Sequence, residues 1–342
     1  KVFVITLPNS QNSQKLSNLG LPLVEHINLN SKNPFNIFIS YQKLKKFIDD
    51  EQIDLINPHC SEGLPLFVFV ALYARSKRPE SPIAIVRTRG TTRLLLNHWL
   101  NRKMHTDWID YHITAGEIVT QRLLSAVPQV ENKVKSIYFP ADYSVIQEKP
   151  VKNFWKEFEI PKNSTVLSVV GRIRAVKGQR ILLQSFSDLL SEFPDLILLI
   201  PYRDTSENEP EMTALRKDIN RLILKDSVRL IPEREDILQI MKFSCLGIVS
   251  SVDSEVICRV AMEFFSVGTP IIALPTGCLP EIIKHGQNGM LAKSKTSEAL
   301  VIEIRNVLSN PELLDRISHG ARRDAEIRFN PDIMLDKTLE VF

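Results

Sequence analysis

The sequence predicts an α/β protein built from two doubly wound domains in tandem. Three observations lead to this prediction: a length of 342 residues, a strand–helix alternation that occurs twice, and an irregular stretch with three prolines, 139–161, between the two occurrences. We therefore expect an N-terminal domain over 1–150, a C-terminal domain over 151–325 and a closing helix over 326–342. The cleft between two such domains is the default ligand site.

In the first domain, short β-type runs alternate with helical segments. We expect strands at 1–7, 54–56, 83–87 and 111–114, and helices at 41–50, 64–75, 97–107 and 117–126. In the helix over 41–50, Leu44, Phe47 and Ile48 fall on one face. This βαβα order implies a mostly parallel sheet with helices on both faces.

The second domain repeats the alternation. We expect strands at 166–170, 196–200, 228–231, 246–249 and 271–273, and helices at 180–193, 211–224, 236–243, 297–308 and 311–327, with a further helix that begins near Ile257. In open parallel sheets, ligands bind at the carboxyl ends of the strands. Polar residues that directly follow these strands are therefore candidates for the functional site.

Composition excludes several classes of protein. Hydrophobic residues make up 44% of the chain, so a sizeable core forms and wholesale disorder is excluded. The 43 lysines and arginines nearly balance 40 acidic residues, so we expect no nucleic-acid partner. The four cysteines form no CxxC pair and no cluster with histidine, which favours reduced thiols in a cytosolic protein and no metal site.

The segment GRIRAVKG, Gly171 to Gly178, follows an expected strand and precedes an expected helix. Gly171 permits a tight turn, and Arg172 and Lys177 would stand at the mouth of the site. Two cations there suit a diphosphate, although both residues could equally be ordinary surface cations near a helix start. The GxxxxGK[ST] pattern of a phosphate-binding loop is absent.

Two glutamates, Glu255 and Glu263, frame the start of the helix expected near Ile257. The free N–H groups at a helix N-terminus form a ready anion site. Glu263 could accept hydrogen bonds from the two hydroxyls of a ribose, and Glu255 could do so for a sugar. The alternative is a solvated helix with one capping and one surface carboxylate, because carboxylates are rarely buried unless paired.

Several elements in order resemble a known family. They are GRIRAVKG, the two glutamates with seven residues between them, the turn 268–270, the glycine turn into Pro-Glu at 277–281, and the Asn-Gly pair at 288–289. From 166 onward they resemble the donor-binding domain of retaining glycosyltransferases of family 4. The resemblance implies the GT-B fold, with two Rossmann-like domains facing a cleft, and more faintly extends back to residue 54.

The resemblance implies a role for each matched position. Arg172, Lys177 and Glu255 would be the catalytic residues, because the two cations would neutralise the departing diphosphate and Glu255 would contact the transferred sugar. Glu263 would hold the ribose hydroxyls. The remaining donor-binding positions are Gly171, Ile257, Cys258, Arg259 and Val260. Family members of this fold need no metal, so we expect no cofactor and a nucleoside-diphosphate sugar as substrate, UDP more than GDP.

The chain departs from the family pattern at three places. Residues 256–259 are bulkier than the glycine-containing residues usual there, and Pro201 follows a strand that usually leads into a glycine. The family's first strand and its Gly-Gly loop are not found, and 1–7 resembles the second strand better. We therefore expect that an N-terminal piece of a few tens of residues is missing from this sequence.

The acceptor half carries a basic and apolar segment. Arg87 and Arg89 are followed by three further cations, interleaved with three leucines and Trp99. This pattern indicates an anionic or lipid-linked acceptor, or contact with a membrane surface, and a solvated basic face is the open alternative. With His59 at a strand end, Arg87 and Arg89 are our acceptor-side candidates.

The sequence thus predicts a cytoplasmic retaining glycosyltransferase, with contact at the inner membrane face as a possible addition. It would move a hexose-type sugar to a glycan or lipid-linked acceptor, as in envelope polysaccharide or lipopolysaccharide synthesis. A sugar-nucleotide epimerase of the same fold is a rival, but no bracketing acid/base pair is evident. A non-catalytic nucleotide-sugar-binding subunit is the other rival, and a nicotinamide dehydrogenase is disfavoured because GxGxxG is absent.

Overall fold

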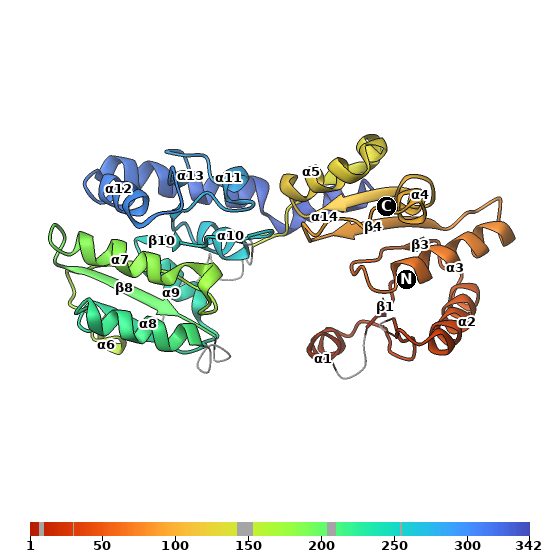
Figure 1. Cartoon of the computed structure of the whole chain (residues 1–342), viewed down its shortest axis with the longest axis horizontal. Coiled ribbons are helices and arrows are strands. Elements are labelled where there is room, and N and C mark those ends of the chain that lie inside the picture. Colours follow the sequence, from red (N-terminus) through yellow and green to blue (C-terminus); the bar gives the residue numbers. More distant parts are fainter. Residues whose placement is uncertain (7–9, 30, 142–152, 204–209, 254) are drawn as a thin grey trace. The chain divides into compact units, whose positions relative to one another are not determined.

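The computed structural model of the protein describes residues 1–6, 10–29, 31–141, 153–203, 210–253 and 255–342. These residues form an α/β chain with two compact units (Figure 1). Unit 1 comprises Lys1–Ala115, Val119–Ile137 and Thr338–Phe342, and unit 2 comprises Gly116–Ile118 and Tyr138–Lys337. The expected domain boundary at 150/151 lies outside the described residues.

Unit 1 is built on a four-stranded parallel sheet in the order β3-β4-β5-β6. Its strands are β3 (Leu55–Ile56), β4 (Ala84–Arg89), β5 (Tyr111–Thr114) and β6 (Val134–Ser136). A separate parallel ladder joins β1 (Val4–Ile5) to β2 (Leu23–Val24). The strand predicted over 1–7 is therefore shorter in the structure, and neither β2 nor β6 is predicted from the sequence.

The helices of unit 1 alternate with its strands along the chain. They are α1 (Gln11–Asn18), α2 (Pro34–Asp50), α3 (Leu64–Lys77), α4 (Trp99–Lys103) and α5 (Glu117–Ala126), with a π-helical turn over Met104–Trp108 and a 3₁₀ turn over Pro128–Lys133. Leu44 and Ile48 of α2 join Val68 and Ala71 of α3 in one core with Ile85 of β4. The helix predicted over 97–107 is thus divided, since α4 passes into a π-helical turn.

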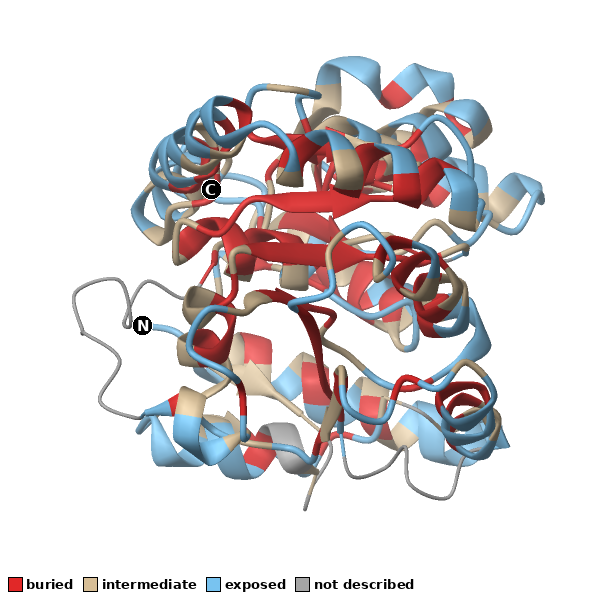
Figure 2. Cartoon of the chain, turned by 90° about the vertical axis from the view of Figure 1, so that its left-hand side faces the viewer, coloured by how far each residue is buried: buried red, intermediate tan, exposed pale blue. Residues whose placement is uncertain are grey.

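Unit 2 is built on a six-stranded parallel sheet in the order β12-β11-β10-β7-β8-β9. Its strands are β7 (Thr165–Ser168), β8 (Leu196–Pro201), β9 (Val228–Ile231), β10 (Leu246–Val249), β11 (Ile271–Ala273) and β12 (Gly289–Leu291). Figure 2 shows these strands as buried ribbons between helices whose outer faces are exposed. The continuous apolar runs of β8 and β10 fit this position, because a parallel sheet covered on both faces has no solvent side.

Two layers of helices cover the sheet of unit 2. The helices are α6 (Phe154–Glu157), α7 (Gln179–Leu189), α8 (Pro210–Arg221), α9 (Ile237–Phe243), α10 (Arg259–Ser266), α11 (Leu279–Ile282), α12 (Ser297–Leu308), α13 (Pro311–Arg328) and α14 (Pro331–Leu339). Contacts group α7 with α8 and α12, and α10 with α9 and α13. On β11, Ile272 packs into the core under α7, α8 and α12, whereas Ile271 and Ala273 pack into the core under α9, α10 and α13. Successive side chains of a strand point to opposite faces of the sheet, so this alternation is expected.

Candidate functional site

Two loops of unit 2 leave the sheet where its strand order reverses. The first strand of the sheet, β7, pairs with β8 on one side and with β10 on the other, where Gly247 lies opposite Ser168. Because these strands are parallel, the segments that follow β7 and β10 leave the same edge. Ligands of doubly wound sheets bind at such a switch point. This edge of unit 2 is therefore the candidate donor site.

The two loops are in close contact at Gly178, the N-cap residue of α7. Gly178 has a φ of 64°, and a Cβ atom there would lie 2.0 Å from the carbonyl oxygen of Ser250. The Ser250 hydroxyl donates to the Lys177 carbonyl at 2.9 Å, and the Val252 N–H donates to the Val176 carbonyl at 3.0 Å. A glycine is required here because only a backbone without Cβ allows this approach. The contact fixes Lys177 beside the loop after β10.

Lys177 and Glu255 form an ion pair at the centre of the site. The Lys177 Nζ atom lies 2.5 Å from Glu255 Oε1, and the Ser251 hydroxyl donates to the same oxygen at 2.5 Å. The Glu255 side chain is 6% exposed, whereas that of Lys177 is 27% exposed. A buried carboxylate is stable when paired and hydrogen-bonded, so the solvated-helix alternative does not hold for Glu255.

A second glycine lets the chain close behind Glu255. Gly277 has a φ of 57°, and a Cβ atom there would lie 1.8 Å from the Glu255 carbonyl oxygen. The same oxygen accepts a hydrogen bond from the Cys278 N–H at 2.7 Å. The glycine turn after β11 therefore holds the backbone of Glu255 while Lys177 and Ser251 hold its side chain.

Arg172 differs from Lys177 because its side chain is exposed. In the described part of the chain its guanidinium has no hydrogen bond or ion pair, while its carbonyl accepts from Gln179 Nε2 at 2.9 Å. Gly171 has a φ of 149° and open space where a Cβ atom would be. Arg172 is thus an unengaged cation on the same loop as the engaged Lys177.

The helix after Glu255 begins at Arg259, two residues later than predicted, with Cys258 as its N-cap. The Cys258 N–H donates to Cys278 Sγ at 3.2 Å, and the Arg259 N–H donates to the Ile257 carbonyl at 2.8 Å. Arg259 is exposed, whereas Ile257 and Val260 are half-buried. Two of the backbone N–H groups expected to meet the donor are therefore engaged within the protein in this structure.

Glu263 lies on α10, two turns beyond Glu255 along the helix. It is half-buried, and its backbone carbonyl accepts from the Ser266 hydroxyl at 2.7 Å. Behind the helix entrance, burial raises the pKa of the Cys258 thiol well above its usual value, and burial raises that of Cys278 to about 12. Both thiols are neutral at physiological pH, so they line the site without adding charge.

The acceptor-side candidates lie in unit 1, where β4 ends. Arg87 and Arg89 are buried, with 1% and 3% exposure, so the alternative of a solvated basic face does not hold for these two residues. His59, in the segment after β3, keeps part of its surface open to solvent. Desolvation, and then the charge of Arg87, lower the pKa of His59. Sequence analysis assigned these cations to a ligand surface but did not predict their burial.

Three residues that shape the donor site were given no site role from the sequence, although two of them, Gly178 and Gly277, lie in the motifs quoted above. Ser251 contacts Glu255, and Gly178 and Gly277 permit the two close backbone approaches. The signal for Ser251 was its place directly after β10. The glycines could be suspected from their positions after strands, but the partner atoms lie in distant segments and are visible only in the folded chain.

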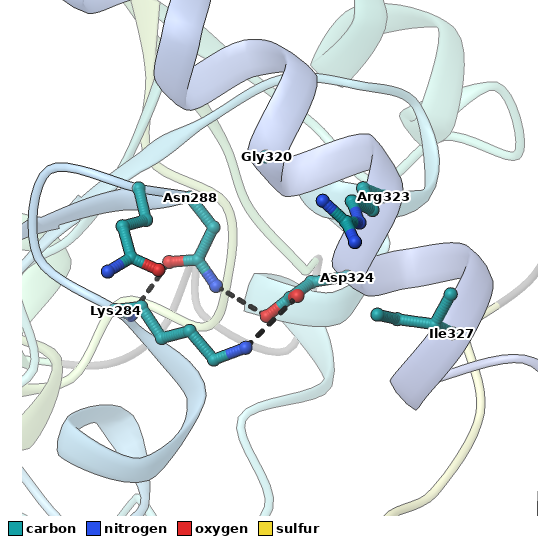
Figure 3. A pocket seen from close by; sticks show the side chains of 7 residues that line it. Lys284, Asn288, Gly320, Arg323, Asp324 and Ile327 are labelled. Carbon is teal, nitrogen blue, oxygen red and sulfur yellow. Dashed lines mark hydrogen bonds and ion pairs between the residues drawn. The ribbon is translucent and has the colours of Figure 1, made fainter.

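A pocket of about 330 Å³ lies elsewhere in unit 2, beside α13 (Figure 3). Its lining residues are Lys284, Gln287, Asn288, Gly320, Arg323, Asp324 and Ile327. Asp324 accepts from Asn288 Nδ2 at 2.8 Å, Lys284 Nζ at 3.3 Å and Arg328 at 2.6 Å. This carboxylate is fully engaged in holding the 284–289 turn to α13, which gives the pocket a structural role.

The described residues contain no group of three or more His, Cys, Asp and Glu side chains placed to hold a metal ion. Within the same residues, no helix combines the length and the apolar character needed to cross a bilayer.

The fold agrees with comparisons to known proteins. The sequence profile of the family described as Glycosyl transferases group 1 matches residues 151–324, which is about half of the chain. The chain therefore belongs to this family, and the family predicted from its motifs is confirmed.

Curated relatives extend the match into the first half of the chain. Spore coat protein SA of Bacillus subtilis (strain 168) is 26% identical over 240 residues, covering 67% of this chain and 64% of that protein. N-acetyl-alpha-D-glucosaminyl L-malate synthase of Bacillus anthracis is 21% identical over 306 residues, covering 87% and 76%. The chain thus spans slightly less than two thirds of the first of these relatives.

Solved structures match nearly the whole chain. A glycosyltransferase from Rickettsia africae ESF-5 aligns with a TM-score of 0.87 at 19% identity, over 99% of this chain and 88% of that one. Anabaena Alr3699/HepE in complex with UDP aligns with a TM-score of 0.84 at 18% identity, over 99% and 92%. At such identities the likeness concerns the fold, and it confirms the predicted GT-B class with two Rossmann-like domains.

Proposed function

We propose that this protein is a retaining glycosyltransferase that moves a sugar from a nucleoside diphosphate to a glycan or lipid-linked acceptor. The observation that carries the proposal is the buried Lys177–Glu255 pair, held by Ser251 at the switch point beside the unengaged Arg172. A lysine, an arginine and a buried carboxylate at this edge suit a diphosphate joined to a polyhydroxylated group.

Each residue then has a role in the proposed reaction. The diphosphate would contact Arg172 and Lys177. Its negative charge would replace part of the attraction that Lys177 has for Glu255 in the structure without ligand. Glu255 would accept hydrogen bonds from hydroxyls of the transferred sugar, and Glu263 from those of the ribose. The half-buried and exposed residues from Ile257 to Val260 would border the donor.

The two cations supply the main catalytic effect in this proposal. Sugar transfer passes through an oxocarbenium-like state as the bond from the anomeric carbon to the diphosphate oxygen breaks. The leaving diphosphate keeps the electron pair, so negative charge grows on its oxygen. Fixed positive groups directed at that oxygen lower the barrier, and removing one such group typically costs about 10²- to 10³-fold in rate. No metal or other cofactor is part of the proposal.

A UDP-sugar is the proposed donor. The support is that Anabaena Alr3699/HepE, which shares the fold, has been solved in complex with UDP. The acceptor class is supported by residues of unit 1, where cations follow β4. The name of the Bacillus anthracis relative, N-acetyl-alpha-D-glucosaminyl L-malate synthase, contains L-malate, which is an anion. A role in envelope polysaccharide or lipopolysaccharide synthesis remains part of the proposal.

Thermal unfolding with nucleotides tests the donor site. We expect UDP to raise the unfolding midpoint of the parent, since a ligand at 100 times its Kd adds about 2.7 kcal/mol to folding stability. Glu263→Ala should lose the response, and Glu326→Ala, an exposed position on α13, should keep it. If GDP and not UDP raises the midpoint of the parent, the proposed donor base is guanine and not uracil. A parent that responds to no nucleotide would remove the proposal.

Turnover separates the proposal from its non-catalytic rival. The N–H groups of Cys258 and Arg259, which were expected to contact the donor, are engaged within the protein, and this departure from the expected site is the observation behind the rival. The assay is release of UDP from UDP-sugars on addition of cell-envelope extract, with product linkage read by NMR. Binding of UDP without any turnover would support the binding subunit, and an anomeric configuration opposite to that of the donor would remove the retaining assignment.

We also propose a cytoplasmic location with contact to an anionic bilayer through the segment after β4. Leu94, Leu96 and Trp99 are 71%, 73% and 74% exposed, and exposed cations lie beside them at Arg93 and Arg102. The sequence contains no carboxylate between Glu80 and Asp107. Apolar and aromatic side chains flanked by cations suit an anionic lipid surface.

Sedimentation with vesicles tests this contact. The parent should bind phosphatidylglycerol vesicles and not phosphatidylcholine vesicles, and salt should weaken the binding. A Leu94→Ser/Trp99→Ser variant should remain in the supernatant, whereas Ile327→Ser, at an exposed position of α13, should not change the result. Equal binding of the parent to neutral vesicles would contradict the role of charge.

A further inference from the structure

Two buried arginines of unit 1 have no acidic partner among the residues that the structure describes. Arg87 and Arg89 are the fourth and last residues of β4, and both side chains are almost fully buried. Their hydrogen bonds go to uncharged atoms: Arg87 donates to the Pro58 carbonyl at 2.7 Å and to the Ser61 hydroxyl at 3.4 Å, and Arg89 donates to the Arg93 carbonyl. Within the described residues, neither guanidinium forms an ion pair.

Three half-buried arginines of the chain are paired with acids, whereas Arg78 and Arg229 donate only to backbone carbonyls among the described residues. Arg75 contacts Asp110, Arg234 contacts Asp236 at 2.7 Å, and Arg328 contacts Asp324 at 2.6 Å. Burial, followed by the charge of Arg89, lowers the pKa of Arg87 to about 10. The charge of Glu62, an exposed residue, acts to raise the pKa of Arg87, but it is the smallest of the contributions to that pKa. An unpaired buried charge lowers the stability of a protein, so the burial of both Arg87 and Arg89 needs an explanation.

The cluster also contains buried polar atoms without partners. Within the described residues, the Nε atoms of Arg87 and Arg89 and the Nδ1 atoms of His105 and His112 have no hydrogen bond. The two histidine rings stack at 5.3 Å between centroids. Burial first, with the neighbouring charges adding to it, lowers the pKa of His105 to about 3 and that of His112 to about 4. The histidines are therefore neutral, and the arginines carry the net positive charge.

The cluster lies where a ligand is expected. β4 lies between β3 and β5 in a parallel sheet, so its last residues lie at the carboxyl edge. Beyond Arg89 the chain runs through 90–98, which forms neither helix nor strand and in which Arg93, Leu94 and residues 96–98 are exposed. The Arg93 carbonyl of this segment occupies the guanidinium of Arg89. The Arg93 carbonyl is an uncharged acceptor in a short irregular segment, so a charged acceptor can displace it from the Arg89 guanidinium.

We infer that Arg87 and Arg89 form an oxyanion site that binds a phosphate-type group carried by the acceptor. This inference rests on the proposed function and names the acceptor class that the N-terminal unit selects. A planar guanidinium donates two parallel hydrogen bonds to a phosphate or carboxylate, and the unpartnered Nε atoms supply donors for this. The anion would take the place of the missing counter-charge.

The test uses the full chain, inorganic phosphate as the probe, and saturating UDP to occupy the donor site. Phosphate should raise the unfolding midpoint of the parent and of Arg122→Met, an exposed arginine of α5. In Arg89→Met the phosphate response should be lost, and the midpoint without phosphate should rise by a few degrees, because replacing an unpaired buried charge by an apolar side chain removes its desolvation cost. Arg87→Met is a second variant with the same expectation.

Three results would overturn the inference. They are a parent midpoint that phosphate does not shift, a phosphate response that survives in Arg89→Met, and a phosphate response that saturating UDP abolishes. The last result would assign the anion to the donor diphosphate. The UDP response itself tests the proposed function separately. If UDP does not bind, the same phosphate comparison in a Lys177→Ala background still decides the inference, because the donor site then lacks a cation.

Discussion

The two units each place cations at the carboxyl edge of a parallel sheet, but they balance the charge differently. In unit 2, Lys177 is paired with Glu255, and Ser251 completes the hydrogen bonding. In unit 1, Arg87 and Arg89 have only uncharged acceptors among the described residues. The paired site is stable without ligand and must exchange a partner to bind one. The unpaired site is complete only when a ligand brings negative charge.

The largest expected effect comes from Gly277→Ala, because Gly277 lies in close contact with the backbone of Glu255. The Cβ atom would lie 1.8 Å from a carbonyl oxygen at a φ of 57°, so the glycine turn and the loop after β10 must separate. We expect a loss of about 4 kcal/mol in unfolding free energy, in the range of the most damaging substitutions. Urea denaturation measures it.

Gly268→Ala is the matched control for this change. Its φ is 79°, but a Cβ atom there meets nothing within 4 Å. Only the left-handed backbone is then penalised, at about 1 kcal/mol. Equal losses for the two variants would show that close approach does not shape the paired site.

Lys177→Ala should have the next largest effect, because it leaves Glu255 buried without its cation. We expect a loss of about 3 kcal/mol in unfolding free energy, at the low end for a broken buried pair since Lys177 is partly exposed. Turnover should fall about 10²- to 10³-fold as leaving-group stabilisation is removed. Lys217→Ala, at an exposed position of α8, is the control.

A double variant sharpens this prediction. Lys177→Ala combined with Glu255→Gln removes both charges, so most of the lost stability should return while turnover stays low. If stability does not recover, the lysine acts through packing rather than through its charge, and the contrast between a paired and an unpaired unit would be wrong.

The histidines of unit 1 predict a loss of stability at low pH. The pKa of His112 is about 4 in the folded chain against 6.5 for an ordinary histidine, so below pH 6.5 the unfolded chain binds more protons. Stability from this group is full above pH 6.5 and declines as the pH falls toward 4. At pH 5 the loss is about 2 kcal/mol. Hydrogen exchange at pH 7 and pH 5 should locate it in unit 1.

His105→Phe tests the source of this pH dependence. It keeps an aromatic ring stacked on His112 but cannot bind a proton, so the loss between pH 7 and pH 5 should shrink. His26→Phe, at an exposed position, should leave the loss unchanged. A pH profile that is the same in all three proteins would assign the acid sensitivity to other groups.

The smallest effect is expected for Ser251→Ala. The hydroxyl donates to a charged, buried oxygen, so its removal should cost about 1.5 kcal/mol in unfolding free energy. As a positioning residue for Glu255, it should raise KM for the donor sugar more than it lowers affinity for UDP. Ser251→Thr, which keeps the hydroxyl, should restore most of the difference. An unchanged KM would limit Ser251 to a structural role.

Much of the fold was predictable because its signals are local. The strand ranges 228–231, 246–249 and 271–273 and the helix range 297–308 agree with the structure, since apolar runs and helical periodicity are read within a short window. The elements that were missed are short or polar. β2 has two residues, β12 has three, and α1 has no marked apolar face, so none carries a strong pattern.

Positions of site residues were predictable where a motif fixed them. The paired glutamates and GRIRAVKG located Arg172, Lys177, Glu255 and Glu263 in unit 2, and the family match covers all four positions. The roles of these residues stay predictions until the donor experiments are done. The start of α10 was misplaced by two residues because Cys258 is a cap that no preferred capping residue announces.

By itself the sequence determined the fold class, the family and which residue types gather after which strands. Only the tertiary structure decided which charges are paired. Lys177 and Glu255 are 78 positions apart and meet because β7 and β10 are neighbours. Arg87 and Arg89 pair with no acid in the described part of the chain, although Glu62 is much closer in sequence. The type of each residue determines its charge, but its burial and its ion-pair partner depend on which segments the strand order of the sheet brings together.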